Sequence, residues 1–159
     1  MKRTLITIAL LSFVALCFAQ KPYKVMFWNI ENFFDTINDP EVRDDEFTPE
    51  GPKEWTGAKY MKKLANVERV VFDVAAQDKI FPVVVGFSEV ETRSVLEDIV
   101  STEKLAPASY RIVHYDSPEA RGVDVAFIYR PAQFKLEGSR CARAARLPHP
   151  RHPDDVGYD

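Results

Sequence analysis

Along residues 23–28, Tyr23, Val25 and Phe27 alternate with Lys24, Met26 and Trp28. This period of two is the pattern of a β-strand, and it leads directly into Asn29-Ile30-Glu31-Asn32. Because successive side chains of a strand point to opposite faces, Asn29 and Glu31 are predicted to lie on the same side of a sheet. An amide and a carboxylate placed together suit a hard divalent cation or a phosphate group.

A second strand is predicted at residues 82–88, where a continuous apolar run leads to Glu89. Such a run is typical of a strand that is covered on both faces. Apolar residues at helical spacing predict helices from Thr56 to Gln77 and from Thr92 to Lys104. The two predicted strands both end in acidic or amide residues, and this shared feature is the strongest functional indication in the pattern.

The rest of the pattern predicts strands at residues 110–115 and 122–129, and a fifth strand that begins at residues 134–136. The order of elements indicates the α/β class, changing to an antiparallel meander. Residues 35–54 form an acidic loop that contains three prolines. This loop is interpreted either as a solvated surface connection or as a substrate-facing loop near the site.

The N-terminus has the composition of an export signal. Two basic residues precede an apolar run over residues 5–18, and Ala19 then precedes a polar stretch. The run is short for a membrane span, so we predict a signal peptide over residues 1–19, no transmembrane anchor, and a secreted or periplasmic protein. Lipidation at Cys17 is the less favoured alternative, because Leu16 is bulky where a small residue is expected.

Charge and cysteine content narrow the function classes. Removing residues 1–19 takes away two basic residues and no acidic one, so the formal net charge of −3 becomes −5. A mildly acidic chain has no global attraction for a polyanion, so nucleic-acid binding would need a local basic patch or a metal. If Cys17 leaves with the signal, Cys141 is the only remaining thiol and an intrachain disulfide is excluded.

The sequence changes character after Gly138. Residues 139–159 contain four arginines, three prolines, no lysine and no periodic apolar pattern. We predict one domain over residues 20–138, followed by an aberrant or disordered tail. Translation in a shifted reading frame, or a chimeric end, is the preferred interpretation of this tail.

Three ordered motifs resemble the endonuclease/exonuclease/phosphatase superfamily of DNase I-like, metal-dependent phosphodiesterases. The resemblance covers about residues 23–138, and its motifs are Trp28-Asn29-Ile30-Glu31-Asn32, Gly86-Phe87-Ser88-Glu89-Val90-Glu91 and the segment from Arg121 to Pro131. It implies an α/β four-layer αββα sandwich, of which this chain would supply the N-terminal half. Because half a sandwich leaves a sheet uncovered, we expect a large exposed apolar face and a marginal or aggregation-prone polypeptide.

The same resemblance implies roles for individual residues. Glu89 matches the glutamate that holds Mg²⁺ or Mn²⁺, and Asn29 matches the amide that helps to position the phosphate and the metal shell. Glu31 falls where some members place a second carboxylate, and Arg121 falls in a turn that approaches a phosphate. The implied partner is a phosphodiester substrate, either nucleic acid or a phospholipid headgroup, and no stable protein partner is predicted.

The general-base half of the superfamily pattern is missing from this sequence. No Asp-x-Asn follows the fourth predicted strand, and no Asp-His pair occurs. His114 is interpreted as structural, Asp124 as a surface or hydrogen-bonded acid, and His149 and His152 as parts of the tail. Two hypotheses follow: an exported Mg²⁺-dependent phosphodiesterase that is truncated and inactive by itself, or a non-catalytic secreted fragment or binding remnant of one.

Structural interpretations are also expected for several other side chains. Trp28, Phe33 and Phe34 are expected in the core rather than in a substrate-stacking platform. The basic residues of the first helix are interpreted as a solvated face rather than a phosphate-binding patch. These residues are Lys59, Lys62, Lys63 and Arg69.

Overall fold

The computed structural model describes residues 23–140. Within this range the chain forms one mixed sheet with two α-helices, which confirms the α/β class. The strands are β1 (Val25–Phe33), β2 (Val84–Val90), β3 (Arg111–His114) and β4 (Asp124–Tyr129). The helices are α2 (Gly57–Ala76) and α3 (Arg93–Ser101), with 3-10 turns η1 (Asp45–Phe47) and η2 (Ala106–Ala108).

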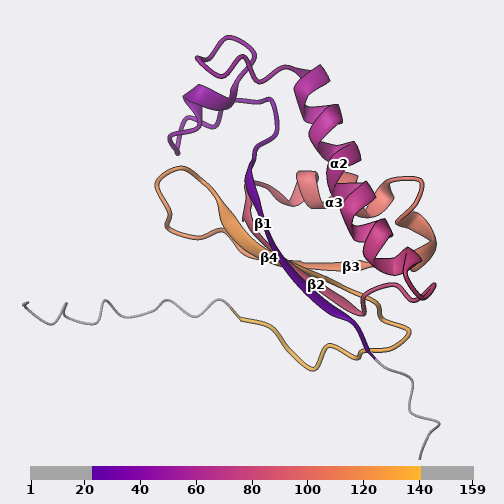
Figure 1. Ribbon diagram of the computed structural model, residues 1–159. Coiled ribbons are helices and arrows are strands. Elements are labelled where there is room, and N and C mark those ends of the chain that lie inside the picture. Colours follow the sequence, from indigo (N-terminus) through magenta and orange to yellow (C-terminus); the bar gives the residue numbers. More distant parts are fainter. Residues whose placement is uncertain (1–22, 141–159) are drawn as a thin grey trace, which may run out of the picture.

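The sheet has the strand order β1-β2-β4-β3 (Figure 1). β1 and β2 are parallel and are joined through α2, whereas β4 is antiparallel to both of its neighbours. The predicted change from an α/β beginning to an antiparallel continuation is therefore confirmed. The parallel pair brings the C-terminal ends of β1 and β2 to the same edge of the sheet.

Both helices begin and bury residues as the sequence pattern predicts. α2 buries Leu64, Val67, Val71 and Ala75, which recur at intervals of three or four residues. α3 starts after Thr92, whose hydroxyl accepts a hydrogen bond from the Val95 N–H at 3.4 Å. α3 ends at Ser101 rather than near Lys104, because Thr102 leaves the helical conformation with ψ at 152°.

The core lies between this helical layer and one face of the sheet. β2 contributes Val85 and Phe87, β4 contributes Ala126 and Ile128, and all four are fully buried. Full burial of a large apolar side chain contributes roughly 1.5–3 kcal/mol, so this layer is the main source of stability. Phe33 and Phe34 are buried and Trp28 packs against the core, which confirms the core interpretation of these aromatics.

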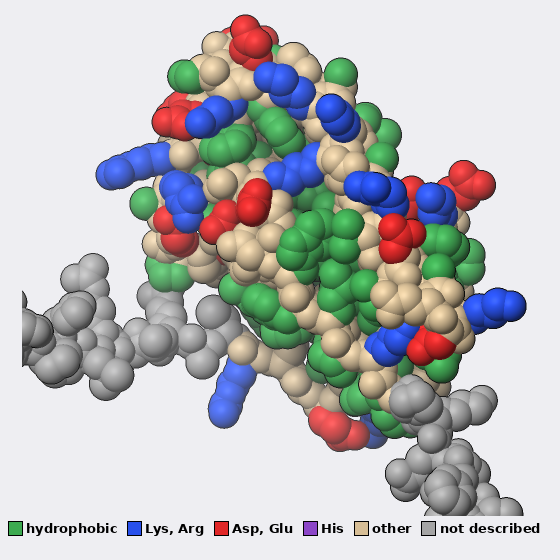
Figure 2. All heavy atoms as spheres, in the orientation of Figure 1, with side chains coloured by type: hydrophobic (Ala, Val, Ile, Leu, Met, Phe, Trp, Pro, Cys, Tyr) green, Lys and Arg blue, Asp and Glu red, His purple; other side chains and the backbone are tan. Residues whose placement is uncertain are grey.

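The opposite face of the sheet is apolar and exposed among the described residues. Phe27 of β1 is 64% exposed and Val125 of β4 is 53% exposed. Both helices pack on one side of the sheet (Figure 1), yet no residue of β2 is exposed, so the expectation that β2 is covered on both faces holds for its own side chains. On the other side Gly86 is shielded by Phe27, whose ring lies 2.6 Å from where a Cβ atom would stand. The expected exposed apolar face is therefore confirmed. In the view of Figure 2, hydrophobic side chains also reach the surface across the middle of the molecule, among charged ones.

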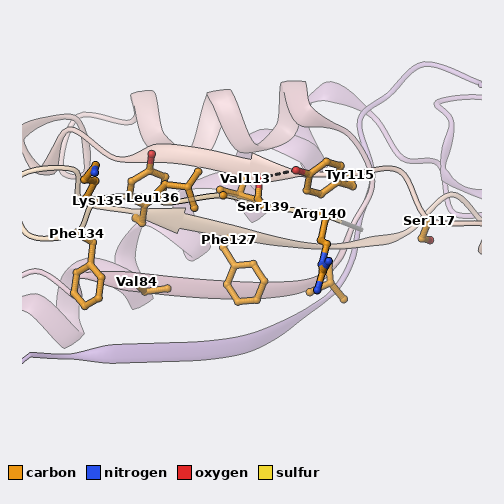
Figure 3. A pocket seen from close by; sticks show the side chains of 13 residues that line it. Val84, Val113, Tyr115, Ser117, Phe127, Phe134, Lys135, Leu136, Ser139 and Arg140 are labelled. Carbon is orange, nitrogen blue, oxygen red and sulfur yellow. Dashed lines mark hydrogen bonds between the residues drawn. The ribbon is translucent and has the colours of Figure 1, made fainter. Parts of the chain in front are cut away.

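The predicted fifth strand at residues 134–136 is wrong, because these residues form no strand. The N–H groups of Gln133 and Phe134 both donate to the Arg130 carbonyl, so the chain turns as β4 ends. The segment then runs beside the open face and helps to line a cavity of about 580 Å³ (Figure 3). Phe134 and Leu136 remain 40% and 46% exposed there, so this segment covers the face only in part.

Several sequence predictions fall outside the described range. The signal peptide, Cys17, Cys141, His149 and His152 all belong to residues 1–22 or 141–159. Among residues 23–140, no helix combines the length and the apolar character that a membrane span requires.

Candidate functional site

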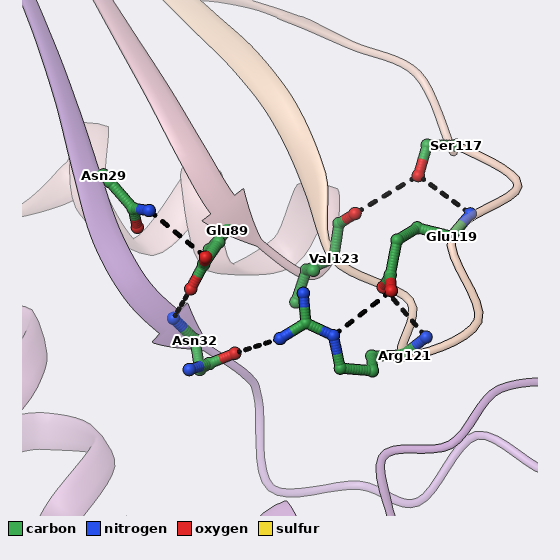
Figure 4. A network of polar contacts seen from close by, with 7 residues as sticks. All are labelled: Asn29, Asn32, Glu89, Ser117, Glu119, Arg121 and Val123. Carbon is green, nitrogen blue, oxygen red and sulfur yellow. Dashed lines mark hydrogen bonds and ion pairs between the residues drawn. The ribbon is translucent and has the colours of Figure 1, made fainter. Parts of the chain in front are cut away.

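Asn29 and Glu89 meet where β1 and β2 end (Figure 4). The two strands are parallel and in register, with Asn29 opposite Ser88, so both side chains reach the same edge. Asn29 Nδ2 donates to Glu89 Oε1 at 3.1 Å. The two predicted strand-end residues are therefore in direct contact, although they are 60 positions apart in the chain.

The backbone is irregular at both strand ends. Glu31, Asn32 and Glu89 have positive φ angles of 55°, 57° and 61°. A residue with a Cβ atom in this left-handed region costs of order 1–2 kcal/mol, which packing elsewhere must offset. The irregularity shifts the register between β1 and β2 and turns the Asn32 N–H toward Glu89 Oε2, at 3.0 Å. Both carboxylate oxygens of Glu89 thus accept a hydrogen bond from β1.

Glu31 contributes to this site mainly through its backbone. Its N–H donates to Asn29 Oδ1 at 2.8 Å, which fixes the orientation of the Asn29 amide. Asn29 and Glu31 are both exposed while Ile30 between them is buried, as the alternation predicts. Within residues 23–140 the Glu31 carboxylate makes no hydrogen bond, so the structure does not join it to the Asn29–Glu89 contact.

Arg121 reaches the same edge from the loop between β3 and β4 (Figure 4). Its Nη1 donates to Asn32 Oδ1 at 3.0 Å, and its Nε donates to Glu119 Oε1 at 3.2 Å. Desolvation acts to raise the pKa of the Glu119 carboxyl, but hydrogen bonds from Arg121 outweigh it and lower this pKa. Asn32 therefore connects Arg121 to Glu89, because its side-chain oxygen accepts from Arg121 and its backbone N–H donates to Glu89.

The acidic loop after β1 supports the Arg121 turn. The Arg43 N–H donates to the Ala120 carbonyl at 2.8 Å. Gly122 has a φ of +78°, and a Cβ atom there would lie 2.9 Å from Val42. Asp44 is only 2% exposed, so this part of the loop is packed against the domain rather than fully solvated.

Lys63 of α2 is a site residue that the sequence analysis placed incorrectly on a solvated face. Its ammonium donates to the carbonyls of Glu31 and Asn32, and it lies 5.6 Å from the ring centroids of Phe33 and Trp55. Burial lowers the pKa of Lys63, and the charges of Glu31 and Glu89 oppose this shift. A signal was present in the sequence, because position 63 belongs to the inward helical series that includes Leu64 and Val67.

A second polar group lies next to this edge, at the start of β4. Asp124 is buried, with Oδ2 at 2.9 Å from His114 Nε2 and Oδ1 accepting from the Ser117 N–H at 2.7 Å. This geometry confirms that Asp124 is a hydrogen-bonded acid. His114 is the only histidine between residues 23 and 140, and this pairing supports the structural role expected for it.

Glu91 is a buried carboxyl at the end of the second sequence motif, which implied no role for it. Burial raises its pKa to about 8, and the Asp35 N–H opposes this effect by donating to Glu91 Oε2 at 2.7 Å. The charges of Asp35, Asp44 and Asp39 raise the pKa further. Its position two residues beyond Glu89, across the β2 irregularity, separates it from the Asn29 contact.

The donor chemistry around Glu89 fits a divalent cation. Glu89 and Asn29 supply only oxygen as ligand atoms, which is what Mg²⁺ and Mn²⁺ prefer. Each carboxylate oxygen of Glu89 has two acceptor sites and uses one for a hydrogen bond within this network. Metal coordination and the observed hydrogen bonds are therefore compatible.

The fold and this edge define an α/β domain with an oxygen-donor centre where two parallel strands end. Residues 24–154 match the model of the Endonuclease/Exonuclease/phosphatase family. The chain belongs to this family, which implies a phosphodiesterase-like or nuclease-like hydrolase. No curated protein and no solved structure matches the chain. The family match begins next to Tyr23, as expected from the motifs, and extends beyond Gly138.

Proposed function

We propose that this protein is an exported, Mg²⁺-dependent phosphodiesterase of nuclease-like type. The observation that supports this proposal most strongly is the Asn29–Glu89 contact at the end of the parallel strand pair, in a chain of this family. Export is proposed from the composition of residues 1–19. The substrate class is a phosphodiester of nucleic acid or of a phospholipid headgroup.

In this proposal Glu89 is the metal ligand, with Asn29 beside it. A bound Mg²⁺ supplies charge neutralisation at the phosphoryl and leaving oxygens. Asn29 holds the Glu89 carboxylate in place through its Nδ2, and the Asn32 N–H holds the other oxygen. Arg121, anchored by Glu119, would contact a phosphate oxygen through the guanidinium donors that its present partners leave free.

Activation of the attacking water needs a base, and residues 23–140 supply no evident one at this edge. Their only histidine, His114, is buried against Asp124 rather than directed to Glu89. The carboxylate of Glu31 is exposed at the same edge, and we propose that it lies near the bound metal as a second acidic group. We therefore propose that the 159-residue chain has little or no hydrolytic activity by itself.

A non-catalytic secreted fragment, or a binding remnant of such an enzyme, is the second candidate function. Two observations favour it: the sequence lacks Asp-x-Asn after β4 and any Asp-His pair, and the described sheet exposes an apolar face. The fragment would bind a ligand or a partner through that face. This candidate requires neither Glu89 nor a metal for its activity.

Hydrolysis of bis-(p-nitrophenyl) phosphate with added Mg²⁺ separates the two candidates. If an active form carrying this domain is assayed, Glu89→Gln is expected to abolish the Mg²⁺-stimulated rate. Glu97→Gln is the matched control, because Glu97 is exposed on α3 and, among residues 23–140, forms an ion pair only with Arg93. Full activity in the Glu89→Gln variant would refute the metal role, and no turnover by any form would favour the fragment.

A further inference from the structure

The segment over residues 134–140 crosses the open face of the sheet and encloses a cavity of about 580 Å³ with it (Figure 3). Two contacts hold this segment in place. The Phe134 ring meets the Tyr23 ring edge-on, with the two centroids 5.7 Å apart. The hydroxyls of Ser139 and Tyr115 are hydrogen-bonded at 2.5 Å. The cavity therefore has a wall besides the sheet, and its volume lies within the roughly 300–1,000 Å³ of small-molecule sites.

The floor of this cavity is an apolar strip along β4. Val125, Phe127 and Tyr129 alternate along the strand and share the face that the core does not use. Val113 of β3 lies opposite Phe127 in the register. Val84 of β2 lies opposite Tyr129 and also lines the cavity. At about 3.3 Å per residue the strip is roughly 13 Å long, so it suits an extended hydrocarbon chain.

The charged residues that line the cavity all have the same sign. They are Lys135 and Arg140, and no carboxylate lines the cavity, although the whole chain has a formal net charge of −3. Lys135 pairs with Glu137 at 3.1 Å, but both side chains are more than 80% exposed, so this ion pair is weak. Arg140 forms no ion pair with any of residues 23–140. Its guanidinium and the hydroxyl of Ser139 are therefore suited to bind an anion.

We propose that this cavity binds a single-chain anionic amphiphile of the fatty-acid class. The hydrocarbon chain lies along the β4 strip, between the sheet and the half-exposed side chains of Phe134 and Leu136. The carboxylate meets Arg140, which lies near one end of the cavity in Figure 3, while Lys135 lies near the other. An apolar partner surface alone would not account for lining charges of one sign. This site is separate from the Glu89 centre, and it does not depend on the proposed hydrolytic function.

Titration of the full 159-residue chain with a dansyl-labelled undecanoic acid, followed by dansyl fluorescence, tests the charge requirement. We expect saturable binding of about one probe per chain, and competition by dodecanoate that is at least tenfold stronger than competition by 1-dodecanol. Arg140→Gln should remove this preference for the carboxylate and leave competition by the alcohol unchanged. Arg111→Gln is the matched control variant, because Arg111 is exposed on β3 and does not line the cavity.

Phe127→Asp tests the apolar floor. Phe127 is 43% exposed on the face opposite the core, so the fold should persist, and far-UV circular dichroism checks this. The variant should bind the probe at least tenfold more weakly, whereas Met61→Asp, at a 58% exposed position of α2, should bind it like the unmodified chain. If Phe127→Asp does not fold, Arg140→Gln at its exposed position still decides the test.

Three results would each overturn the proposal. They are equal competition by dodecanoate and 1-dodecanol, equal probe binding by Phe127→Asp and Met61→Asp, and no saturable binding at all. In the last case, analytical ultracentrifugation that shows a stable dimer would assign the open face to a second copy of the chain. Loss of hydrolysis in Glu89→Gln with the probe still bound would concern the Glu89 centre alone.

Discussion

At the scale of single residues, the strand-end site is organised by hydrogen bonds from β1 to one carboxylate. Glu89 accepts from the Asn29 amide and from the Asn32 N–H, and Arg121 and Lys63 hold Asn32 from two other elements. Each of these contacts restricts where the carboxylate can point. Such positioning lowers the reorganisation needed when a metal or a phosphate binds.

Removing the Asn29 amide should therefore weaken metal binding while the fold persists. Asn29→Ala leaves Glu89 Oε1 without its donor, and loss of such an outer hydrogen bond typically costs 10–100-fold in metal affinity. A Mg²⁺ titration followed by tryptophan fluorescence is suitable, because Trp28 adjoins Asn29 in the sequence. Asn66→Ala on the exposed side of α2 should bind Mg²⁺ like the unmodified chain. Equal affinities for both variants would contradict the positioning role of Asn29.

Lys63 should matter for stability because it satisfies two backbone carbonyls at an irregular strand end. Lys63→Met keeps much of the aliphatic stem but removes the donor to Glu31 and Asn32, which should destabilise the fold by about 1–3 kcal/mol. Lys62→Met, on the exposed side of the same helix, should change stability by less than about 0.5 kcal/mol. Urea denaturation of both variants measures the difference. A similar small effect in both would show that Lys63 is only a surface residue.

At the scale of elements, the sequence predicted the strands and helices that show a regular spacing of apolar residues. Alternation and helical spacing place β1 to β4, α2 and α3 correctly, because burial of one face leaves a repeating trace in each element. Asn29 and Glu89 were found for the same reason, since each comes at the end of an apolar strand pattern. The left-handed turns at Glu31 and Glu89 leave no such trace, because these residues are not glycine.

Contacts between elements that are distant in the chain could not be predicted from the spacing of apolar residues either. The absence of a strand at residues 134–136 depends on a turn around Arg130, which apolar content alone does not reveal. The pairing of His114 with Asp124 depends on the register of β3 with β4. The shielding of Gly86 by Phe27 depends in the same way on the register of β1 with β2.

The loop after β1 and the end of β2 together create a pH dependence of stability. The pKa of Glu91 is raised to about 8 in the folded protein from its ordinary value of 4.5, so the native state binds a proton that the unfolded chain releases. The contribution of Glu91 to stability is fully present below about pH 4.5 and is lost as the pH rises through about 8.

Glu91→Gln should therefore flatten this dependence. With a chelator present to remove metal ions, stability of the unmodified chain should fall between pH 5 and pH 8 more steeply than that of the variant, by on the order of 2 kcal/mol. Denaturant melts at several pH values measure both slopes. Glu97→Gln, which changes an exposed carboxylate, should keep the original slope. Identical slopes for Glu91→Gln and the unmodified chain would contradict the buried, protonated state of Glu91.

At the scale of the whole molecule, the described sheet is covered by helices on one face and is apolar on the other. Phe27, Val125 and Phe127 are exposed on the open face. Val125 and Phe127 also line the cavity near residues 134–140, where Figure 3 shows Phe127. Exposed contiguous apolar surface promotes association. The polypeptide over residues 20–159 is therefore expected to self-associate and to be marginally stable.

A charge placed on the open face should reduce this association. Val125→Lys puts an ammonium at a position that is 53% exposed, so the fold should tolerate it. The charge should weaken apolar association between copies of this face. Analytical ultracentrifugation should show a smaller average mass for this variant than for the unmodified chain, and than for Val125→Thr as a neutral control. An unmodified chain that stays monomeric and melts cooperatively would contradict the expectation.

The central claim is that Glu89 is the ligand of a divalent-cation centre at the end of the parallel strand pair. Calorimetric titration of Mg²⁺ into the unmodified chain, Glu89→Gln and Glu97→Gln tests it most directly. The account predicts saturable binding to the unmodified chain and to Glu97→Gln, and at least tenfold weaker binding to Glu89→Gln. Equal Mg²⁺ affinity in all three chains would contradict the account.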